Sequence, residues 1–215
     1  MIKNIKQNLL WQEGGTLLIK IAVLIAMAFL IKSTVFSIFC LIVIWFSFYF
    51  FRNPDRLLPE IDSLDIISPS DGKVIDIAYN LDNPEYAQKI SIFLSPLDVH
   101  VNWIPIDGEI EKVEYKSGTF AFAFTPKSSE LNERNDIVIK DNKSRKVLVR
   151  QIAGTIARKI VCWIKNKEQV KLGQKYGMIK FGSRVEIFLP KDVEIKVKLS
   201  DRVIGGKTII GKWLC

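Results

Sequence analysis

The sequence predicts a mainly β protein, a sandwich or partly closed barrel, preceded by an N-terminal α-helical membrane hairpin. Three observations predict this fold class: an apolar stretch from Thr16 to Phe51, an abrupt change to charged and proline-containing sequence after it, and a long series of short β-type runs from Ile66 onward. We therefore expect a membrane-anchoring hairpin at residues 1–51 and a β-rich catalytic or binding domain at residues 52–215.

The apolar stretch divides into two helical halves. Val35 to Phe51 would extend about 26 Å as a helix, near the lower limit for spanning a hydrocarbon core. Ile21 to Ile31 is shorter and requires Lys20 and Lys32 to reach outward. Because a second, longer apolar run follows the first, a cleaved signal peptide does not fit. The sequence leaves open whether the hairpin crosses the bilayer or lies within one leaflet.

The chain is basic, with a formal net charge of +8. Such a charge favours a polyanionic partner, and the apolar N-terminus favours an anionic bilayer over nucleic acid. Positive side chains flank both outer ends of the hairpin, so we expect both ends and the main domain on the cytoplasmic side of the cell membrane. These side chains are Lys3, Lys6, Arg52 and Arg56. The cysteines have neither metal-binding nor redox spacing, which indicates a reducing compartment and no metal site.

The second part of the chain consists of short alternating or β-branched runs separated by Gly, Pro, Asn or Asp. No amphipathic helix of three turns interrupts them, which favours antiparallel β structure over parallel βαβ units. The predicted strands are Lys73–Ala78, Lys89–Leu94, Gly108–Tyr115, Ile137–Ile139, Lys146–Ile152, Thr155–Ile164, Arg184–Leu189 and Val193–Leu199.

Three segments carry polar groups where a β domain would not need them. Asp71, in Ser68–Lys73, has the ordinary interpretation of a turn aspartate that bonds the local backbone. His100, the single histidine of the chain, lies in Ser95–Asn102 and would ordinarily be a solvated loop residue. The third segment, Thr125–Asn135, is either an inert polar loop or part of a site.

Alternating aromatic residues precede that third segment, at Phe120, Phe122 and Phe124. Such a row forms one face of a pocket or core. A Gly-Ser pair, Gly182–Ser183, lies between two strand-like runs, where the backbone can turn sharply and present a hydroxyl to its own preceding carbonyl. Taken alone, a Gly-Ser pair is a common hairpin feature.

Five short motifs, in this order and at these spacings, resemble those of phosphatidylserine decarboxylase proenzymes of the short, anchored bacterial and archaeal type. The resemblance covers most of residues 51–190. The motifs are Phe-Arg-Asn-Pro at 51–54, Pro-Ser-Asp-Gly at 69–72, Ser-Pro-Leu-Asp-Val-His at 95–100, Asn-Glu-Arg-Asn at 132–135 and Gly-Met-Ile-Lys-Phe-Gly-Ser at 177–183.

The resemblance implies that the chain cuts itself between Gly182 and Ser183, giving a β chain of residues 1–182 and an α chain of residues 183–215. Ser183 Oγ would attack the preceding carbonyl, and elimination and hydrolysis would convert Ser183 into a covalent pyruvoyl cofactor. Serine needs an adjacent base for this step, and His100 is the only histidine available. Asp71, or Asp98, would orient that base.

The implied reaction converts phosphatidylserine into phosphatidylethanolamine and CO₂. The pyruvoyl carbonyl would form a Schiff base with the lipid amine and accept electrons as CO₂ leaves, with no metal or pyridoxal phosphate. His100 would donate the proton to the α-carbon. Lys127 or Arg134 would hold the lipid phosphate, and the face that includes Phe122 would keep water from the carboxylate.

The chain departs from longer relatives at one position, where their second histidine is replaced by Trp103. The resemblance therefore leaves open whether His100 serves processing, decarboxylation or both. It also implies a fold related to the hybrid β domains of biotinyl and lipoyl carriers, and a homo-oligomer. The two chains should stay associated after cutting, because separation would expose unpaired strands.

Two other functions remain open from the sequence. One is a pyruvoyl-dependent decarboxylase acting on another amine-bearing substrate, although a soluble substrate gives no reason for a membrane hairpin. The other is an uncleaved, membrane-anchored β-domain binding module in which Gly182–Ser183 is only a turn.

Overall fold

The computed structural model describes residues 15–118, 132–154, 160–180 and 183–214. The chain divides into two compact units, residues 1–55 and residues 56–215. The described helices belong to the first unit and the described strands to the second.

The first unit is a helical hairpin. Helix α2 (Gly15–Ile31) and helix α3 (Thr34–Phe50) are joined through Lys32 and Ser33. The side chain of Ser33 caps α3 by accepting a hydrogen bond from the Phe36 amide. The predicted helical hairpin and its joint are therefore confirmed. By length and hydropathy, neither described helix qualifies as a membrane-spanning segment.

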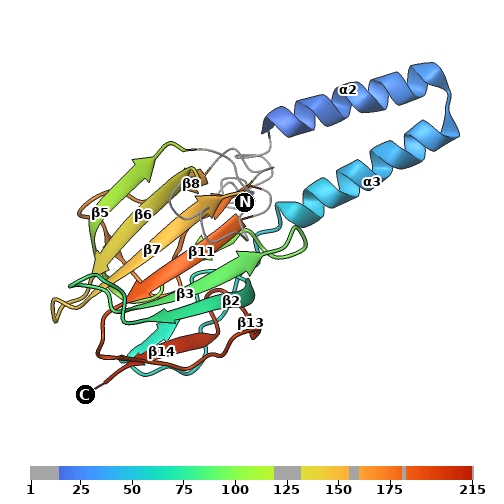
Figure 1. Cartoon of the computed structure of the whole chain (residues 1–215). Helices are drawn as coiled ribbons and strands as arrows, with labels where there is room; N and C mark the ends of the chain where they lie inside the picture. The colour runs from blue at the N-terminus through green and yellow to red at the C-terminus, as the bar shows by residue number, and fades with distance from the viewer. Residues whose placement is uncertain (1–14, 119–131, 155–159, 181–182, 215) are drawn as a thin grey trace. The chain divides into compact units, whose positions relative to one another are not determined.

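Antiparallel sheets make up the second unit (Figure 1). The largest has the strand order β13-β2-β3-β11-β7-β6-β5-β9, and two three-stranded sheets have the orders β1-β14-β12 and β4-β10-β8. The large sheet comprises β2 (Gly72–Tyr79), β3 (Gln88–Leu94), β5 (Gly108–Lys116), β6 (Arg134–Lys140), β7 (Lys146–Ala153), β9 (Gln169–Val170), β11 (Ser183–Leu189) and β13 (Arg202–Val203). The small sheets comprise β1 (Asp65–Ile67), β4 (Val101–Trp103), β8 (Ile160–Cys162), β10 (Lys175–Ile179), β12 (Val193–Ile195) and β14 (Ile209–Trp213).

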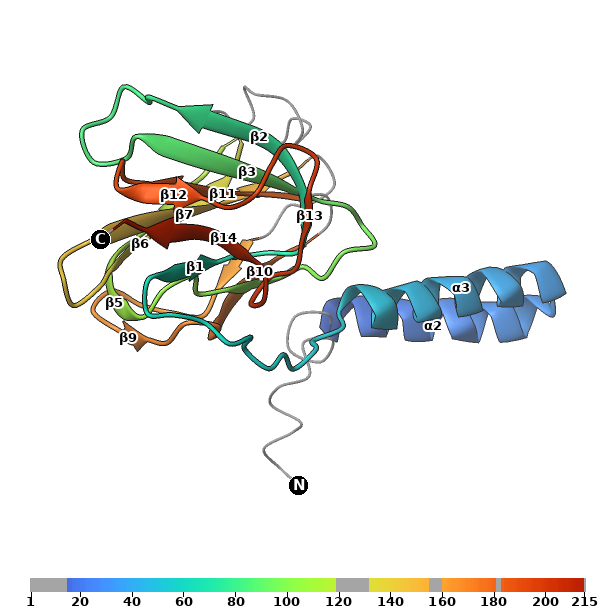
Figure 2. The ribbon, with the colours of Figure 1, turned by 90° about the horizontal axis from the view of Figure 1, so that it is seen from below.

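The hydrophobic core lies between the large sheet and the two small ones, and Figure 2 shows strands of the small sheets lying across the large sheet. Alternation along β11 explains this arrangement, because successive side chains of a strand point to opposite faces. Val185, Ile187 and Leu189 are fully buried members of the core cluster. Tyr176 and Ile210 join it from the small sheets.

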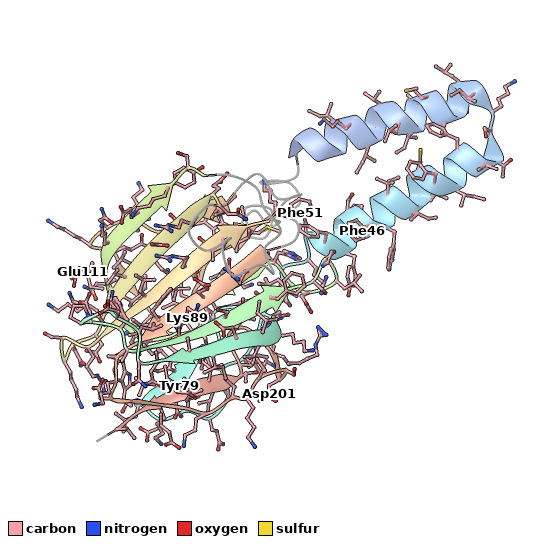
Figure 3. All side chains as sticks on the ribbon, viewed as in Figure 1. Phe46, Phe51, Tyr79, Lys89, Glu111 and Asp201 are labelled. Carbon is pink, nitrogen blue, oxygen red and sulfur yellow. The ribbon has the colours of Figure 1, made fainter. Side chains whose placement is uncertain are left out.

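The opposite face of β11 carries charged residues, Arg184 and Glu186, and both are buried. Arg184 Nη2 lies 3.3 Å from Glu186 Oε1. Lys89, which Figure 3 labels on β3, lies 3.9 Å from the same carboxylate. Arg150 adds an ion pair with Asp136 at 2.8 Å. Pairing of this kind offsets the cost of removing ionised groups from water.

The predicted strands agree with the observed ones over most of the sheet, with three differences. Residues 155–159 of the predicted strand Thr155–Ile164 lie outside the described residues, and its described part is the short strand β8. The predicted strand Val193–Leu199 is too long, since β12 ends at Ile195 and Asp201 closes a turn by accepting from the Lys198 amide. Strands β1, β4, β9, β13 and β14 were not predicted, and all of these except β14 have only two or three residues, too few to show an alternating pattern.

Candidate active site

Ser183 begins β11, the strand between β3 and β7 in the large sheet. It pairs with Leu94 on β3 and Ala153 on β7. Its side chain lies on the same face as Val185, toward the core, and is fully buried. The Ser183 hydroxyl has no hydrogen-bond partner among the described residues. A buried hydroxyl in this state is costly, which points to a use other than packing.

The strand pairing brings His100 to the same end of the sheet. Leu94 pairs with Ser183, and the chain after Leu94 passes through residues 95–100 into β4, where Val101 pairs with Met178 of β10. The Ile179 amide donates to the His100 carbonyl at 3.2 Å. The connection from Leu94 to Val101 therefore has Ser183 beside its first end and Ile179, four residues before Ser183, beside its last.

A backbone hydrogen bond sets the tautomer of His100. Its Nδ1 lies 2.9 Å from the carbonyl oxygen of Asp98. Because a carbonyl can only accept, Nδ1 carries the proton and Nε2 is left with its lone pair. His100 is fully buried. This is the protonation pattern that a general base requires.

The carboxylate of Asp98 is engaged away from the histidine ring. It accepts from the Ser95 amide at 2.8 Å and from Arg202 Nη2 at 2.6 Å. Burial alone would raise the pKa of Asp98, but the hydrogen bonds from Arg202 and Ser95 outweigh it and hold that pKa below its usual value. Asp98 thus orients His100 through its carbonyl and fixes the loop through its carboxylate.

Asp71 has a different set of partners from those that the sequence suggests. Its two carboxylate oxygens accept from Arg56, at 2.5 and 2.9 Å, and one also accepts from the Gly205 amide at 2.8 Å. The Arg56 guanidinium lies 4.3 Å from the ring centre of Trp103. The bonds of Asp71 are thus long-range rather than those of a local turn. They join the start of the second unit to its C-terminal part.

The Asn-Glu-Arg-Asn motif meets the strand next to Ser183. Asn132 Nδ2 donates to the Ala153 carbonyl at 2.7 Å, and the Ala153 amide donates to the Glu133 carbonyl. Arg134 pairs with Ile152, which in turn pairs with Arg184. By strand alternation the Arg134 side chain lies on the face opposite that of Ser183.

Three predicted site residues, Gly182, Lys127 and Phe122, lie outside the described residues. Within the described part of the chain, no three His, Cys, Asp or Glu side chains gather as a metal-ion site would require. Sequence reasoning missed Arg202 and Gln151, and it assigned Arg56 only as a charge flanking the hairpin. The position of Arg56 beside the Phe-Arg-Asn-Pro motif was the one available signal for its role.

A family model described as phosphatidylserine decarboxylase matches residues 43–211. The chain belongs to the phosphatidylserine decarboxylase family. The predicted resemblance is therefore confirmed over most of the chain, and the five motifs fall inside or at the edge of the matched range.

Curated relatives agree with this family. A phosphatidylserine decarboxylase proenzyme of Carboxydothermus hydrogenoformans is 48% identical over 209 residues, which are 94% of this chain and 96% of the relative. The proenzyme of Syntrophus aciditrophicus is 41% identical over 87% of this chain and 89% of its own length. That of a Wolbachia from Brugia malayi is 42% identical over 93% and 89%.

Proposed function

We propose that this protein is a self-processing, pyruvoyl-dependent phosphatidylserine decarboxylase, which converts phosphatidylserine into phosphatidylethanolamine and CO₂ in phospholipid biosynthesis. The observation that carries the proposal is the buried Ser183 hydroxyl with no described partner, at the position where the family motif is cut. The naming of the relatives as proenzymes supports the same function.

In the self-cleavage, Ser183 Oγ attacks the Gly182 carbonyl carbon. A C–O bond forms as the C–N bond breaks, and the hydroxyl proton passes through His100 Nε2 to the released nitrogen. Removal of the α-proton of residue 183 and breakage of its Cβ–O bond then free residue 182 as a carboxylate. Water hydrolyses the remaining dehydroalanine to a ketone and ammonia.

The surroundings of Ser183 fit a pyruvoyl group. The conversion removes the serine hydroxyl, and this hydroxyl makes no hydrogen bond to a described residue, so no described bond is lost. The group supplies an electron sink for the electrons that CO₂ leaves behind. The chain itself supplies His100, whose tautomer is set by Asp98, as the base in processing and as the proton donor in decarboxylation.

Substrate contacts complete the proposed site. Lys127 and Arg134 are the cations that would hold the lipid phosphate, and Phe122 belongs to the aromatic face that would exclude water from the carboxylate. Register speaks against Arg134, because its side chain lies on the other face of the sheet from Ser183. Asp71 would act by fixing the framework through Arg56 rather than by contacting the base.

The N-terminal hairpin, residues 1–51, would anchor the catalytic domain, residues 52–215, at the cell membrane. Large apolar side chains exposed on its helices support an anchor: Phe29 is 84% exposed, Val35 79% and Leu30 78%. Basic residues at both outer ends of the hairpin favour the cytoplasmic side for the catalytic domain.

After cutting, the β chain (1–182) and the α chain (183–215) would stay together as one folded domain. Strand β11 of the α chain is hydrogen-bonded to β3 and β7 of the β chain along its length, which supports this. The two-layer antiparallel β architecture supports, at the level of fold class, the relation to biotinyl and lipoyl carrier domains. A homo-oligomer completes the proposal.

Denaturing mass measurement of the purified full-length protein tests the self-cleavage. We expect two fragments, residues 1–182 and residues 183–215, with the second blocked at its N-terminus by the ketone that replaces the serine amine. A single intact chain of 24.6 kDa would instead favour the uncleaved binding module.

A second assay tests the substrate. Release of CO₂ from phosphatidylserine in detergent micelles is the expected result. Release from free serine or aspartate, with none from the micelles, would leave the pyruvoyl chemistry in place and overturn the lipid assignment.

A further inference from the structure

Three buried amide side chains form a chain of hydrogen bonds between the large sheet and the β4-β10-β8 sheet. Asn135 Nδ2 on β6 donates to Gln151 Oε1 on β7 at 3.0 Å. Gln151 Nε2 in turn donates to Asn102 Oδ1 on β4 at 2.8 Å. Asn102 and Gln151 are fully buried, and Asn135 is 3% exposed. We call these three residues the amide brace.

The amide brace packs closely against the β4-β10-β8 sheet. Asn102 pairs with Gly177 across β4 and β10. A Cβ atom placed on Gly177 would lie 3.0 Å from Gln151 Nε2 and closer still to the Val161 carbonyl oxygen. Only glycine leaves room for this approach. The Gln151 side chain therefore fixes how near β4 and β10 come to the large sheet.

Two residues of the brace are close to the proposed catalytic pair in strand register or along the chain. Gln151 is opposite Val185, two positions after Ser183 on the same face of β11. Asn102 comes two positions after His100 on the strand that this histidine leads into. Two residues along a strand span about 7 Å. The bond between Gln151 and Asn102 thus links β4, which follows His100 directly, to β7, the strand paired with the Ser183 strand β11.

The last group of the brace, at the Asn102 end, is a hydrogen-bond donor. Its Nδ2 is buried and finds no acceptor among the described residues. Leaving a buried amide donor unsatisfied destabilises the folded state. An apolar side chain of similar size would pack here without that cost. The amides therefore do something that packing alone does not require.

We propose that the amide brace is a positioning element for the Ser183–His100 pair, holding β4, which follows the base directly, at a fixed distance from β7, the strand paired with the nucleophile's strand β11. The proposal rests on the proposed function and adds to it three residues that do not touch the reacting atoms. Attack on a carbonyl depends steeply on alignment, and a displacement of about 1 Å can cost about a hundredfold in rate.

The test measures the rate of self-cleavage during cell-free synthesis of the full-length chain, read as the appearance of fragment 183–215 by mass. We expect Gln151→Leu, which removes both hydrogen bonds at nearly constant volume, to slow the cleavage on the order of a hundredfold. In the fraction that matures, we expect kcat for phosphatidylserine to fall while KM changes little. Cleavage at the wild-type rate would overturn the proposal.

Gln88 is the matched control. It is a buried glutamine at the far end of β3, opposite Leu189, and its Nε2 donates to the Pro190 and Val193 carbonyls at 3.0 and 2.8 Å. Gln88→Leu should lower the melting temperature as Gln151→Leu does and leave the cleavage rate near wild type. If both variants slow cleavage in proportion to lost stability, the brace has no positioning role. An uncut wild-type chain would overturn the proposed function itself, which is a separate result.

A second variant, Gln151→Glu, tests the positioning role of the brace even if Gln151→Leu does not fold. In Gln151→Glu the protonated carboxyl can accept from Asn135 and donate to Asn102, whereas the ionised carboxylate cannot donate. Burial raises the pKa of the introduced carboxyl. We expect the ratio of its cleavage rate to the wild-type rate to rise as the pH is lowered from about 8 to about 6. A wild-type pH profile in this variant would overturn the proposal.

Discussion

The two ends of the large sheet differ in how their polar groups are satisfied. At one end Ser183, His100 and Asn102 are buried, and the side chains of Ser183 and Asn102 each present a polar atom with no described partner. At the other end a cleft of about 1450 Å³ is lined by charged side chains such as Arg145 and Lys146. Judged by volume alone, the cleft would be taken as the candidate active site.

Two cations of the cleft are already paired with carboxylates. Arg145 pairs with Asp141 at 2.6 Å and lies over the ring of Trp213, and Lys146 pairs with Glu111 at 2.8 Å. Partly exposed pairs of this kind contribute about 0–1 kcal/mol each. The comparison teaches that buried polar groups without hydrogen-bond partners are a better guide to an active site than the volume of a cleft. The predictions below test the contrast between the two ends.

The largest effect is expected at the nucleophile. Ser183→Ala removes the hydroxyl proposed to attack the Gly182 carbonyl, so the chain should stay intact by mass and release no CO₂ from phosphatidylserine. Ser91→Ala is the matched control, because Ser91 is a buried serine on the neighbouring strand β3. Processing of the Ser183→Ala chain would refute the mechanism.

Removal of the base should have the next largest effect. His100→Ala should slow self-cleavage by about 10²–10⁴-fold, the usual contribution of a positioned general base. Time courses of fragment formation measure this. A variant that is cut at the normal rate yet fails to decarboxylate would restrict His100 to the second reaction.

A smaller effect is expected where the His100 loop is tied to the C-terminal part of the chain. Arg202→Ala should lower the free energy of unfolding at neutral pH by at most about 1 kcal/mol, since the Arg202 side chain is largely exposed. Urea unfolding in the uncut Ser183→Ala background measures it.

The pH dependence of that effect has a definite sign. The folded-state pKa of Asp98 is lowered, so its pairing stabilises the fold above the unfolded pKa and is lost as the pH falls through the folded pKa. The difference between Arg202→Ala and its parent should therefore disappear in acid. A difference that persists there would show that Arg202 acts by packing rather than by charge.

The smallest effect is expected at the opposite end. Arg145→Ala removes the pair with Asp141 and the contact over Trp213, and it should change self-cleavage and turnover by less than about twofold. Both rates are measured beside wild type. A large loss of activity here would break the comparison and give the cleft a functional part.

The local sequence pattern predicted many of the strands, as in Lys89–Leu94 and Arg184–Leu189. A strand is recognised from neighbouring residues alone, because its side chains alternate between the two faces of the sheet. The motifs also predicted Ser183 and His100 as site residues, since chemistry restricts the residue types that can serve. Both are described at the same end of the sheet, although the sequence alone gives no distance between them.

The partners of the motif residues were not predictable in the same way. Asp71 pairs with Arg56 and with the Gly205 amide, which lies 134 positions further on. Gln151 reaches Asn102 from a strand 49 positions away. Such contacts depend on how the sheets pack, and local sequence patterns do not predict them.

Strand β11 is the first element after the proposed cut, and it lies inside the sheet rather than at an edge. Within one protomer the precursor folds as a single chain, so no association of separate chains enters the folding of the protomer. Once the bond at Gly182 is broken, unfolding of each protomer yields two molecules, and dilution favours their separation by mass action. Maturation would thus add one molecule per protomer to the unfolding reaction, and the melting temperature of the mature protein should rise more steeply with concentration than that of its precursor.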